Sequence, residues 1–290
     1  MESIHLRAHA KINLTLDVVG KRPDGYHDVE MIMQSVNLWD EIILKEIDRG
    51  IELDSNMKNL PRGSKNIAWR AAELIRKEFG VSRGVNIYIK KNIPIAAGMG
   101  GGSADCAGVL LGLSRLWDLQ IEDETLKALG KSLGADVPFC LTGGTALAQG
   151  IGDILTPITS RADIWLVIIR PNIWVSTKEI YGRLDLNTIG ERPDNEAMIK
   201  HLGAGRISGI AENLVNVLEG VTIPMHLQIA RIKSQLMEQG ALGSLMSGTG
   251  PTVYGVFKNQ FSARRAARVL RKKYRHTYVV NTVDRGIHIG

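Results

Sequence analysis

The chain contains 290 residues, of which 44% are hydrophobic and 23% are charged, and its formal net charge is +6. These are ordinary values for a globular protein, and the length suits one large or two medium domains. The two cysteines form neither a disulfide framework nor metal-ligand spacing, which is typical of a reducing compartment. No apolar run reaches membrane-spanning length and the N-terminus has no signal-peptide core, so we expect a cytoplasmic protein without a membrane partner.

The first predicted element is a strand over residues 4–18. Its even positions are all apolar: Ile4, Leu6, Ala8, Ala10, Ile12, Leu14, Leu16 and Val18. Its odd positions are all polar: His5, Arg7, His9, Lys11, Asn13, Thr15 and Asp17. A period of two over this length predicts a strand with one buried face. Lys11 and Asn13 are neighbours on the polar face, and most lysines in such a position simply meet solvent.

A turn follows at residues 21–27. Pro23-Asp24-Gly25 favours a turn because proline presets φ and glycine accepts a positive φ. Tyr26 and His27 leave this turn side by side. They are interpreted either as ordinary packing residues or as a pair that stacks on a base.

The most informative segment is residues 94–107, Pro-Ile-Ala-Ala-Gly-Met-Gly-Gly-Gly-Ser-Ala-Asp-Cys-Ala. A strand predicted over 85–89 precedes it, and a helix predicted over 104–117 follows. A glycine-rich loop that ends at a helix N-terminus presents free backbone N–H groups and can bind phosphate. We expect glycine there because a Cβ would hold the backbone away from the phosphate oxygens. The alternative is an ordinary glycine-rich turn.

Familiar phosphate motifs do not fit this loop. A Walker loop that ends in Gly130-Lys131-Ser132 would need glycine at position 125, where the chain has threonine. A dinucleotide fingerprint that starts at Gly98 would need glycine at Ser103, and the His-Arg-Asp and Asp-Phe-Gly triplets of protein kinases are absent. The phosphate loop is therefore of another kind.

Two further segments bear candidate functional groups. A helix predicted over 124–133 ends near Gly134, and Pro138 bars its continuation, so Asp136 lies in a short break. Its carboxylate is either a turn former or a base. Residues 245–252, with two glycines, hydroxyls and a proline, form a second tight loop before a strand predicted over 253–257.

The remaining elements are predicted more simply. We expect helices over 67–79, 225–239 and 262–273, a strand over 278–283, and a second half of the chain that begins near residue 164. Ser176 to Glu179 reads as a capping box for a short helix. The seven basic residues between 264 and 275 predict an amphipathic helix with Ala266, Val269, Leu270 and Tyr274 facing inward. A solvated face is favoured over nucleic-acid binding, because no recognition motif accompanies it.

Four segments, taken in chain order, resemble the GHMP small-molecule kinases (galactokinase, homoserine kinase, mevalonate kinase and phosphomevalonate kinase). They are the N-terminal strand, the glycine-rich loop, the break that contains Asp136 and the loop at residues 245–252. The matching residues are 10–14, 22–27, 94–107, 134–139 and 246–252, with smaller matches at 66–68 and 175–177. The superfamily usually has serines where this chain has Gly101 and Gly102. The cytidyl-dependent branch has glycines there, so the resemblance is to that branch. Many of its members have a second serine at Ala104, which leaves Ser103 as the loop's only hydroxyl and the metal ligands unknown.

The resemblance implies an α+β fold of two domains, an N-terminal α/β domain over residues 1–160 and a C-terminal ferredoxin-like α+β domain over 161–290. The active site would lie in the cleft between them. It implies ATP-dependent phosphorylation of the 2-hydroxyl of 4-diphosphocytidyl-2-C-methyl-D-erythritol in the non-mevalonate isoprenoid pathway, with Mg²⁺. The alternatives are another GHMP kinase, acting on mevalonate, homoserine or a sugar, and a non-enzymatic nucleotide- or RNA-binding protein.

The resemblance also implies site residues. Asp136 would accept the proton of the substrate hydroxyl, Lys11 would stabilise developing charge, and Asn13 would orient the substrate. Tyr26 and Tyr181 would sandwich cytosine, and His27 would hydrogen-bond it. The other expected substrate-binding residues are Thr177, Ser247 and Gly248. The expected ATP-binding residues are Asn66, Pro94, Ile95, Ala96, Ala97, Gly98, Met99, Gly100, Gly101, Gly102, Ser103 and Ala104.

Overall fold

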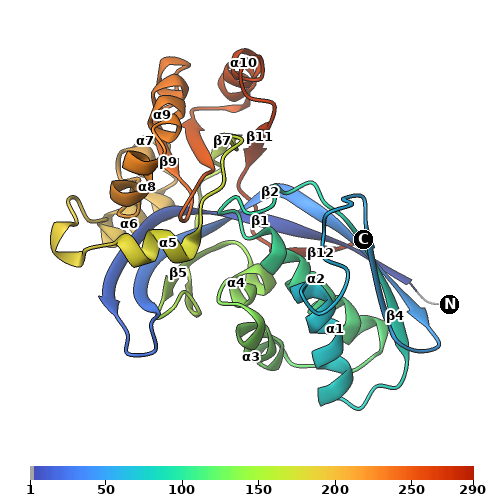
Figure 1. Cartoon of the computed structure of the whole chain (residues 1–290). Coiled ribbons are helices and arrows are strands. Elements are labelled where there is room, and N and C mark those ends of the chain that lie inside the picture. The colour runs from blue at the N-terminus through green and yellow to red at the C-terminus, as the bar shows by residue number, and fades with distance from the viewer. Residues whose placement is uncertain (1–2) are drawn as a thin grey trace.

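The computed structural model describes residues 3–290 and contains two β-sheets (Figure 1). The larger sheet has the strand order β12-β1-β2-β4-β3; β5 pairs with β2 and β6, and β8 pairs with β1. Its strands are β1 (Ser3–Lys21), β2 (His27–Ile47), β3 (Ile51–Ser55), β4 (Gly84–Lys90), β5 (Thr145–Gln149), β6 (Ile154–Pro157), β8 (Val215–Asn216) and β12 (Ile287–Ile289).

The long hairpin of β1 and β2 runs through both halves of the molecule (Figure 1). The alternation predicted for β1 is confirmed, because all its even positions from Leu6 to Val18 are buried. The expectation that its polar face meets solvent is wrong from residue 10 onward, where every residue to 18 is buried. The second half of the chain covers this face: the Tyr254 hydroxyl donates to the carbonyl of Asn13 (2.8 Å), and the Thr15 hydroxyl donates to Asn195 (2.6 Å).

Four helices of the first half pack with the larger sheet around a shared apolar core. They are α1 (Ile67–Glu78), α2 (Gly101–Leu116), α3 (Asp123–Leu133) and α4 (Val137–Thr142). Helix α2 begins three residues earlier than predicted, because Gly100 adopts a left-handed conformation (φ 68°) as N-cap and the next glycines are already helical. Helix α4 was not predicted. Pro138 lies in its first turn, where a missing N–H costs no helical bond, so proline starts a helix here. The preceding helix has already ended at Leu133, with Gly134 as its C-cap.

The smaller sheet has the order β11-β7-β10-β9 with antiparallel pairs throughout. Its strands are β7 (Trp165–Ile169), β9 (Gly243–Met246), β10 (Val253–Phe257) and β11 (Thr277–Asn281). Helices α9 (Gln228–Glu238) and α10 (Gln260–Leu270) pack against this sheet, which gives the predicted ferredoxin-like arrangement. The shorter helices of this half are α5 (Thr177–Arg183), the 3₁₀ helix η1 (Leu186–Thr188), α6 (Asn195–Ala204), α7 (Ile207–Glu212) and α8 (Glu219–Met225).

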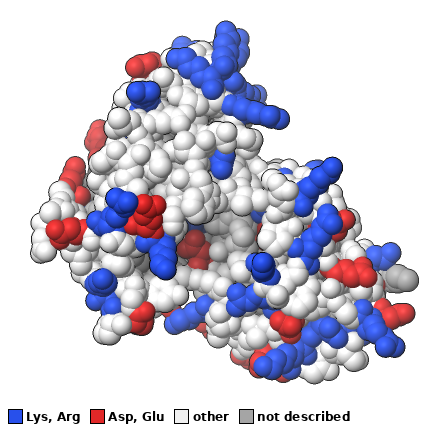
Figure 2. Space-filling model, viewed as in Figure 1, with Lys and Arg blue, Asp and Glu red and all other residues white. Residues whose placement is uncertain are grey.

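The basic helix α10 is amphipathic as predicted, with Ala263, Ala266, Ala267 and Leu270 buried. Val269 is 41% exposed, so its predicted inward position is wrong. Figure 2 shows Lys and Arg side chains gathered at the end of the molecule where α10 lies. The sequence favours a solvated face over nucleic-acid binding here, and this stays a prediction.

The two halves share strands as well as a core. The last strand, β12, returns to pair with residues 6–8 of β1, and β8 pairs in parallel register with residues 15–16 on the same edge, opposite β2. The predicted division near residue 160 stays a prediction, and β12 crosses it. None of the helices in residues 3–290 is long and apolar enough to span a membrane.

Candidate active site

Lys11 and Asp136 lie 125 positions apart in the chain and meet in space. The Lys11 Nζ atom is 3.3 Å from Asp136 Oδ2 and donates to Asn13 Oδ1 at 3.1 Å. The Lys11 side chain is 6% exposed, whereas that of Asp136 is 30% exposed. The carboxylate therefore has one side against the lysine and another that solvent, or a substrate, can reach. Figure 2 shows a hollow in this face of the molecule, with acidic atoms at its base.

Asp136 owes its position to helix α4. It is the N-cap residue of that helix, but its side chain makes no capping hydrogen bond. The carboxylate oxygen of a capping aspartate would accept a hydrogen bond from a backbone N–H group of the first turn. Because Asp136 does not, its carboxylate is available to Lys11 and to a ligand, which favours the base over the turn former.

The glycine-rich loop folds directly over Lys11. The Lys11 backbone N–H donates to the carbonyl of Met99 (3.0 Å), and α2 starts immediately after Gly100. No side chain in residues 3–290 caps this helix start, and its first turn contains no acidic residue. The N-terminal N–H groups of a sixteen-residue helix are thus left for a ligand, with the positive end of the helix dipole behind them.

The loop's side chains divide into two groups. Ala97, Met99 and Ala104 belong to the apolar core, so any contact of these residues with a nucleotide runs through the backbone. Ile95 and Ala96 are exposed on the outer side of the loop. A serine at position 104 would therefore point its hydroxyl into the apolar core, where this chain has a buried methyl group.

The glycines of this loop also allow close packing within the protein, and the close approach to phosphate expected of them stays a prediction. A Cβ at Gly101 would lie 2.9 Å from Ile93 Cγ2, and one at Gly98 would lie 2.3 Å from the carbonyl oxygen of Ser247. At Gly100 it would lie 2.9 Å from Lys11 Cγ. These directions point into the protein, so glycine permits close packing beneath the loop. Only at Gly102, where the nearest atom would be 3.8 Å away, is there ordinary room.

A second loop, between β9 and β10, packs against the glycine-rich loop. The Ser247 hydroxyl donates to the carbonyl of Gly98 at 2.9 Å. Gly248, with φ of 58°, lies against Gly98, and a Cβ there would be 3.7 Å from Asn13 Oδ1. The Asn216 amide holds this loop by donating to the carbonyl oxygens of Met246 and Gly248. The structure thus gathers Ser247, Gly248 and Asn13 around the same loop.

The residues expected to bind cytosine lie beside helix α5. The rings of His27 and Tyr181 lie 5.1 Å apart and are tilted by 34°. Tyr26 is 61% exposed, so in this structure His27 rather than Tyr26 lies against Tyr181. Burial, aided by the charge of Asp136, raises the pKa of Tyr181 to about 12. Burial lowers the pKa of His27, which keeps its imidazole neutral at physiological pH.

Two other expected site residues have structural partners. The Thr177 hydroxyl shares a hydrogen bond with that of Thr249 at 3.1 Å. Asn66 is the N-cap of α1: its side chain accepts from the Ala68 N–H and donates to the carbonyl of Pro61, both at 2.9 Å. Helix α1 does begin beside the glycine-rich loop, because Ile67 is the nearest neighbour of a Cβ on Gly102. The adenine contact expected of Asn66 stays a prediction.

The structure adds a group that the sequence did not indicate. Asp40, Lys91 and Asp105 form a buried charged cluster directly below the loop. Asp40 lies within β2, Lys91 directly follows β4, and Asp105 belongs to α2. Lys91 is 51 residues from Asp40 and 14 from Asp105, and no motif spacing signals their meeting.

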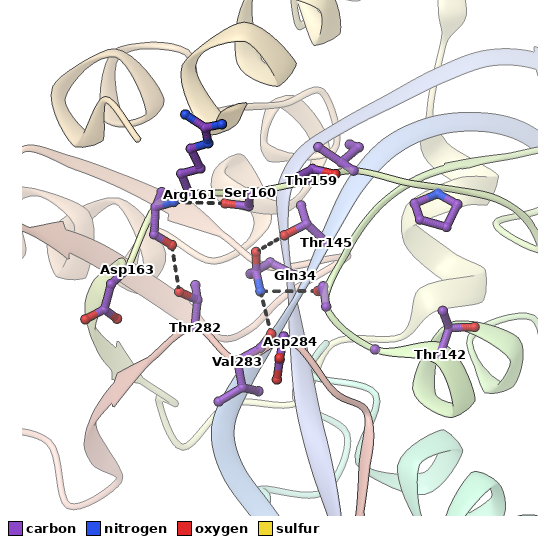
Figure 3. A pocket seen from close by; sticks show the side chains of 15 residues that line it. Gln34, Thr142, Thr145, Thr159, Ser160, Arg161, Asp163, Thr282, Val283 and Asp284 are labelled. Carbon is purple, nitrogen blue, oxygen red and sulfur yellow. Dashed lines mark hydrogen bonds between the residues drawn. The ribbon is translucent and has the colours of Figure 1, made fainter. Parts of the chain in front are cut away.

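A cavity of about 750 Å³ lies outside this site (Figure 3). None of the expected site residues lines it. At its centre the Gln34 amide donates to the carbonyls of Gly144 and Val283 and accepts from the Thr145 hydroxyl (Figure 3). These hydrogen bonds join β2, β5 and the C-terminal segment along the cavity.

The glycine-rich loop offers few ligands for a metal ion. Residues 3–290 contain no cluster of three or more His, Cys, Asp or Glu side chains that could hold a metal ion. The loop supplies one hydroxyl, Ser103, whose Oγ would lie 4.0 Å from a Cβ on Gly134, close to Asp136 in the chain. Magnesium in kinases is held largely by substrate phosphates and water, so this donor set suits an ion that arrives with a nucleotide.

The chain is similar to several known proteins over nearly its whole length. Residues 66–144 match the model of the GHMP kinases N terminal domain, and residues 197–276 match that of the GHMP kinases C terminal region. The chain is 48% identical over 291 residues to the 4-diphosphocytidyl-2-C-methyl-D-erythritol kinase of Clostridioides difficile (strain 630), covering 100% of this chain and 98% of that one. It is 46% identical over 292 residues to the enzyme of the same name from Alkaliphilus oremlandii (strain OhILAs), covering 100% of both. A crystal structure of 4-(cytidine 5'-diphospho)-2C-methyl-D-erythritol kinase superposes with a TM-score of 0.84 at 32% identity, covering 96% of this chain and 98% of that one.

Proposed function

Because the chain belongs to the 4-diphosphocytidyl-2-C-methyl-D-erythritol kinase family of the GHMP kinases, we propose that it transfers the γ-phosphoryl group of ATP to the 2-hydroxyl of 4-diphosphocytidyl-2-C-methyl-D-erythritol. The observation that carries this proposal is the Lys11–Asp136 pair, 3.3 Å apart, beside an uncapped helix start. Phosphoryl transfer depends mainly on positioning and charge neutralisation, and this arrangement supplies a base, a cation and a phosphate cradle.

The proposed step uses this chain's own residues as follows. Asp136 accepts the proton of the acceptor hydroxyl as its oxygen attacks the γ-phosphorus, and the bond to the bridging β–γ oxygen breaks to release ADP. Lys11 stabilises the negative charge on the transferring group and, through Asn13, is held in place beside Asp136. The N–H groups at the start of α2 bind the phosphates. Substrate hydroxyls and phosphates contact the loop of Ser247 and Gly248.

Mg²⁺ would enter with ATP and neutralise phosphate charge. Ser103 is the loop hydroxyl that would hold it, with the remaining positions filled by phosphate oxygens and water. Phosphate and water would supply most of the Mg²⁺ ligands, because the described residues contain no group of three or more His, Cys, Asp or Glu side chains that could hold the ion.

The base is proposed to be recognised at α5. Tyr181 and Tyr26 offer aromatic faces, which supply affinity but little choice among bases. The neutral imidazole of His27 can hydrogen-bond the edge of cytosine, and a site built on such bonds penalises a ligand that leaves them unpaired. Binding therefore requires Tyr26 to turn from its exposed position toward Tyr181.

An acceptor panel with γ-labelled ATP tests this function. We expect label transfer to the cytidine-linked acceptor, at least about tenfold less to its uridine-linked analogue, and none to mevalonate, homoserine or galactose. Efficient labelling of any of the last three would leave only the superfamily assignment. Failure to consume ATP with every acceptor would support the non-enzymatic alternative.

A further inference from the structure

The buried charged cluster below the loop centres on Lys91, which follows β4. Its Nζ donates to Asp105 Oδ2 at 2.6 Å and to Asp40 Oδ2, and lies 3.4 Å from the carbonyl oxygen of Gly101. The three side chains are at most 4% exposed. No solvent or substrate reaches them, so the cluster cannot take part in the reaction itself.

The cluster joins both ends of the glycine-rich loop. Asp40, on β2, accepts from the backbone N–H groups of Asn92 (2.6 Å) and Ile93 (2.8 Å), which lead into the loop. Asp105 lies in the second turn of α2, at the loop's exit, and the Gly101 carbonyl belongs to the first turn. One ammonium group therefore sets the distance between the loop's entry and the helix start whose N–H groups face the nucleotide.

The two carboxylates keep Lys91 charged. Burial would lower the pKa of Lys91, but the two carboxylates outweigh it and raise that pKa. Burial raises the pKa of Asp105 well above its usual range, Asp40 adds to this and Lys91 opposes it. Lys91 therefore carries an ammonium group, whose N–H donors bond both carboxylates and the carbonyl of Gly101.

We infer that Lys91 is a positioning residue for ATP: its ammonium group holds the start of α2 where its free N–H groups meet the phosphate chain. The inference rests on the proposed function, since it assigns the phosphates to this helix start. It distinguishes Lys91 from Lys11, which touches the transferring group. It also distinguishes Lys91 from its neighbour Lys90, whose ammonium pairs with Glu41 at the surface.

The difficulty in testing Lys91 is stability. Removing the lysine alone leaves two buried carboxylates without their cation, which is strongly destabilising whatever the cluster does for ATP. A variant that neutralises all three groups at similar volume, Lys91→Met with Asp40→Asn and Asp105→Asn, removes this penalty. Asn at position 40 can still accept from the backbone of Asn92. Lys90→Met is the matched control.

The experiment compares the affinity of each variant for ATP with Mg²⁺, by calorimetry, and for adenosine, by ligand-observed NMR. We expect the triple variant to fold, to lose at least about tenfold in ATP affinity and to keep its adenosine affinity, because only the phosphate contacts depend on the helix start. Lys90→Met should match the wild type in both.

Several outcomes would overturn the inference. They are an unchanged ATP affinity in the triple variant, an equal loss of ATP and adenosine, or failure of the triple variant to fold, which would make the cluster part of the core's architecture. If the wild type and Lys90→Met themselves fail to bind ATP, the proposed function fails, and that result is separate from the role of Lys91.

Discussion

Two lysine–aspartate groups flank the glycine-rich loop, and they differ mainly in exposure. Beside Gly100, Lys11 pairs with Asp136, whose side chain is 30% exposed. Beside Gly101, Lys91 bonds Asp40 and Asp105, and all three are buried. The same residue types thus have different uses. A carboxylate with an open side can exchange a proton with a substrate, whereas a closed cluster can only fix the geometry of its surroundings.

The largest expected effect on turnover comes from the open group, which is the pair of Lys11 and Asp136. Asp136→Asn keeps the side chain's shape and removes its basicity, so kcat should fall about 10²–10⁴-fold. Steady-state kinetics with the cytidine-linked acceptor measures this. Near-normal turnover would return Asp136 to a turn-forming role.

Lys11→Met tests the second member of the open group. Methionine keeps much of the apolar stem that packs under Gly100, so β1 should still form. Loss of the ammonium should lower kcat about 10²–10³-fold, with only a small change in melting temperature. If activity fell only in proportion to folded protein, the residue's role would be structural.

Gly101 and Gly102 form a matched pair that probes the packing below the loop. A methyl group at Gly101 must displace Ile93, whereas one at Gly102 has room beside Ile67. Gly101→Ala should therefore destabilise the fold by about 1–3 kcal/mol. Gly102→Ala should change stability little, as denaturant unfolding would show. Equal costs at the two positions would contradict the packing explanation of the glycines.

His27→Ala should narrow the choice of acceptor. Without the imidazole, the preference for a cytidine-linked over a uridine-linked acceptor should fall from at least about tenfold toward parity. The ratio of the two kcat/KM values measures it. An unchanged ratio would assign the discrimination to other groups.

His27 should also make the stability of the protein depend slightly on pH. The pKa of His27 is lowered from 6.5 by burial and by Lys21, so the folded state binds fewer protons than the unfolded one below that pH. Its contribution to stability is therefore complete above 6.5 and declines as the pH falls toward the folded pKa. Between about pH 7.5 and about pH 5.5, the melting temperature of His27→Gln should fall slightly less than that of the wild type. An equal or larger fall in the variant would contradict this sign.

Much of the fold could be predicted because its signals are local. The alternation of β1 identified both its buried face and the neighbouring positions of Lys11 and Asn13, and the strand over 253–257 was predicted with the bounds of β10. Helix starts were less predictable. The first turn of α2 lies inside the glycines, because Gly100 supplies the left-handed N-cap, and glycine runs carry no helical periodicity.

The cover over the polar face of β1 could not be predicted, because it comes from residues 180 and more positions away. Tyr254 and Asn195 bury positions that look solvated in the sequence. The Lys91 cluster was missed for the same reason: Asp40, Lys91 and Asp105 each look like ordinary surface charges, and only the packing of β2, β4 and α2 brings them together. The site residues recognised by resemblance were those within contiguous motifs.

The division of roles between the open and closed groups is tested most directly by measuring ATP affinity and kcat together for two proteins, Asp136→Asn and the triple variant at positions 40, 91 and 105. The account predicts a crossed result. Asp136→Asn should bind ATP like the wild type and fail in turnover, whereas the triple variant should bind ATP at least about tenfold more weakly and recover much of its kcat at saturating ATP. If both variants lost the same quantity in the same proportion, exposure would not separate their roles, and the account would be contradicted.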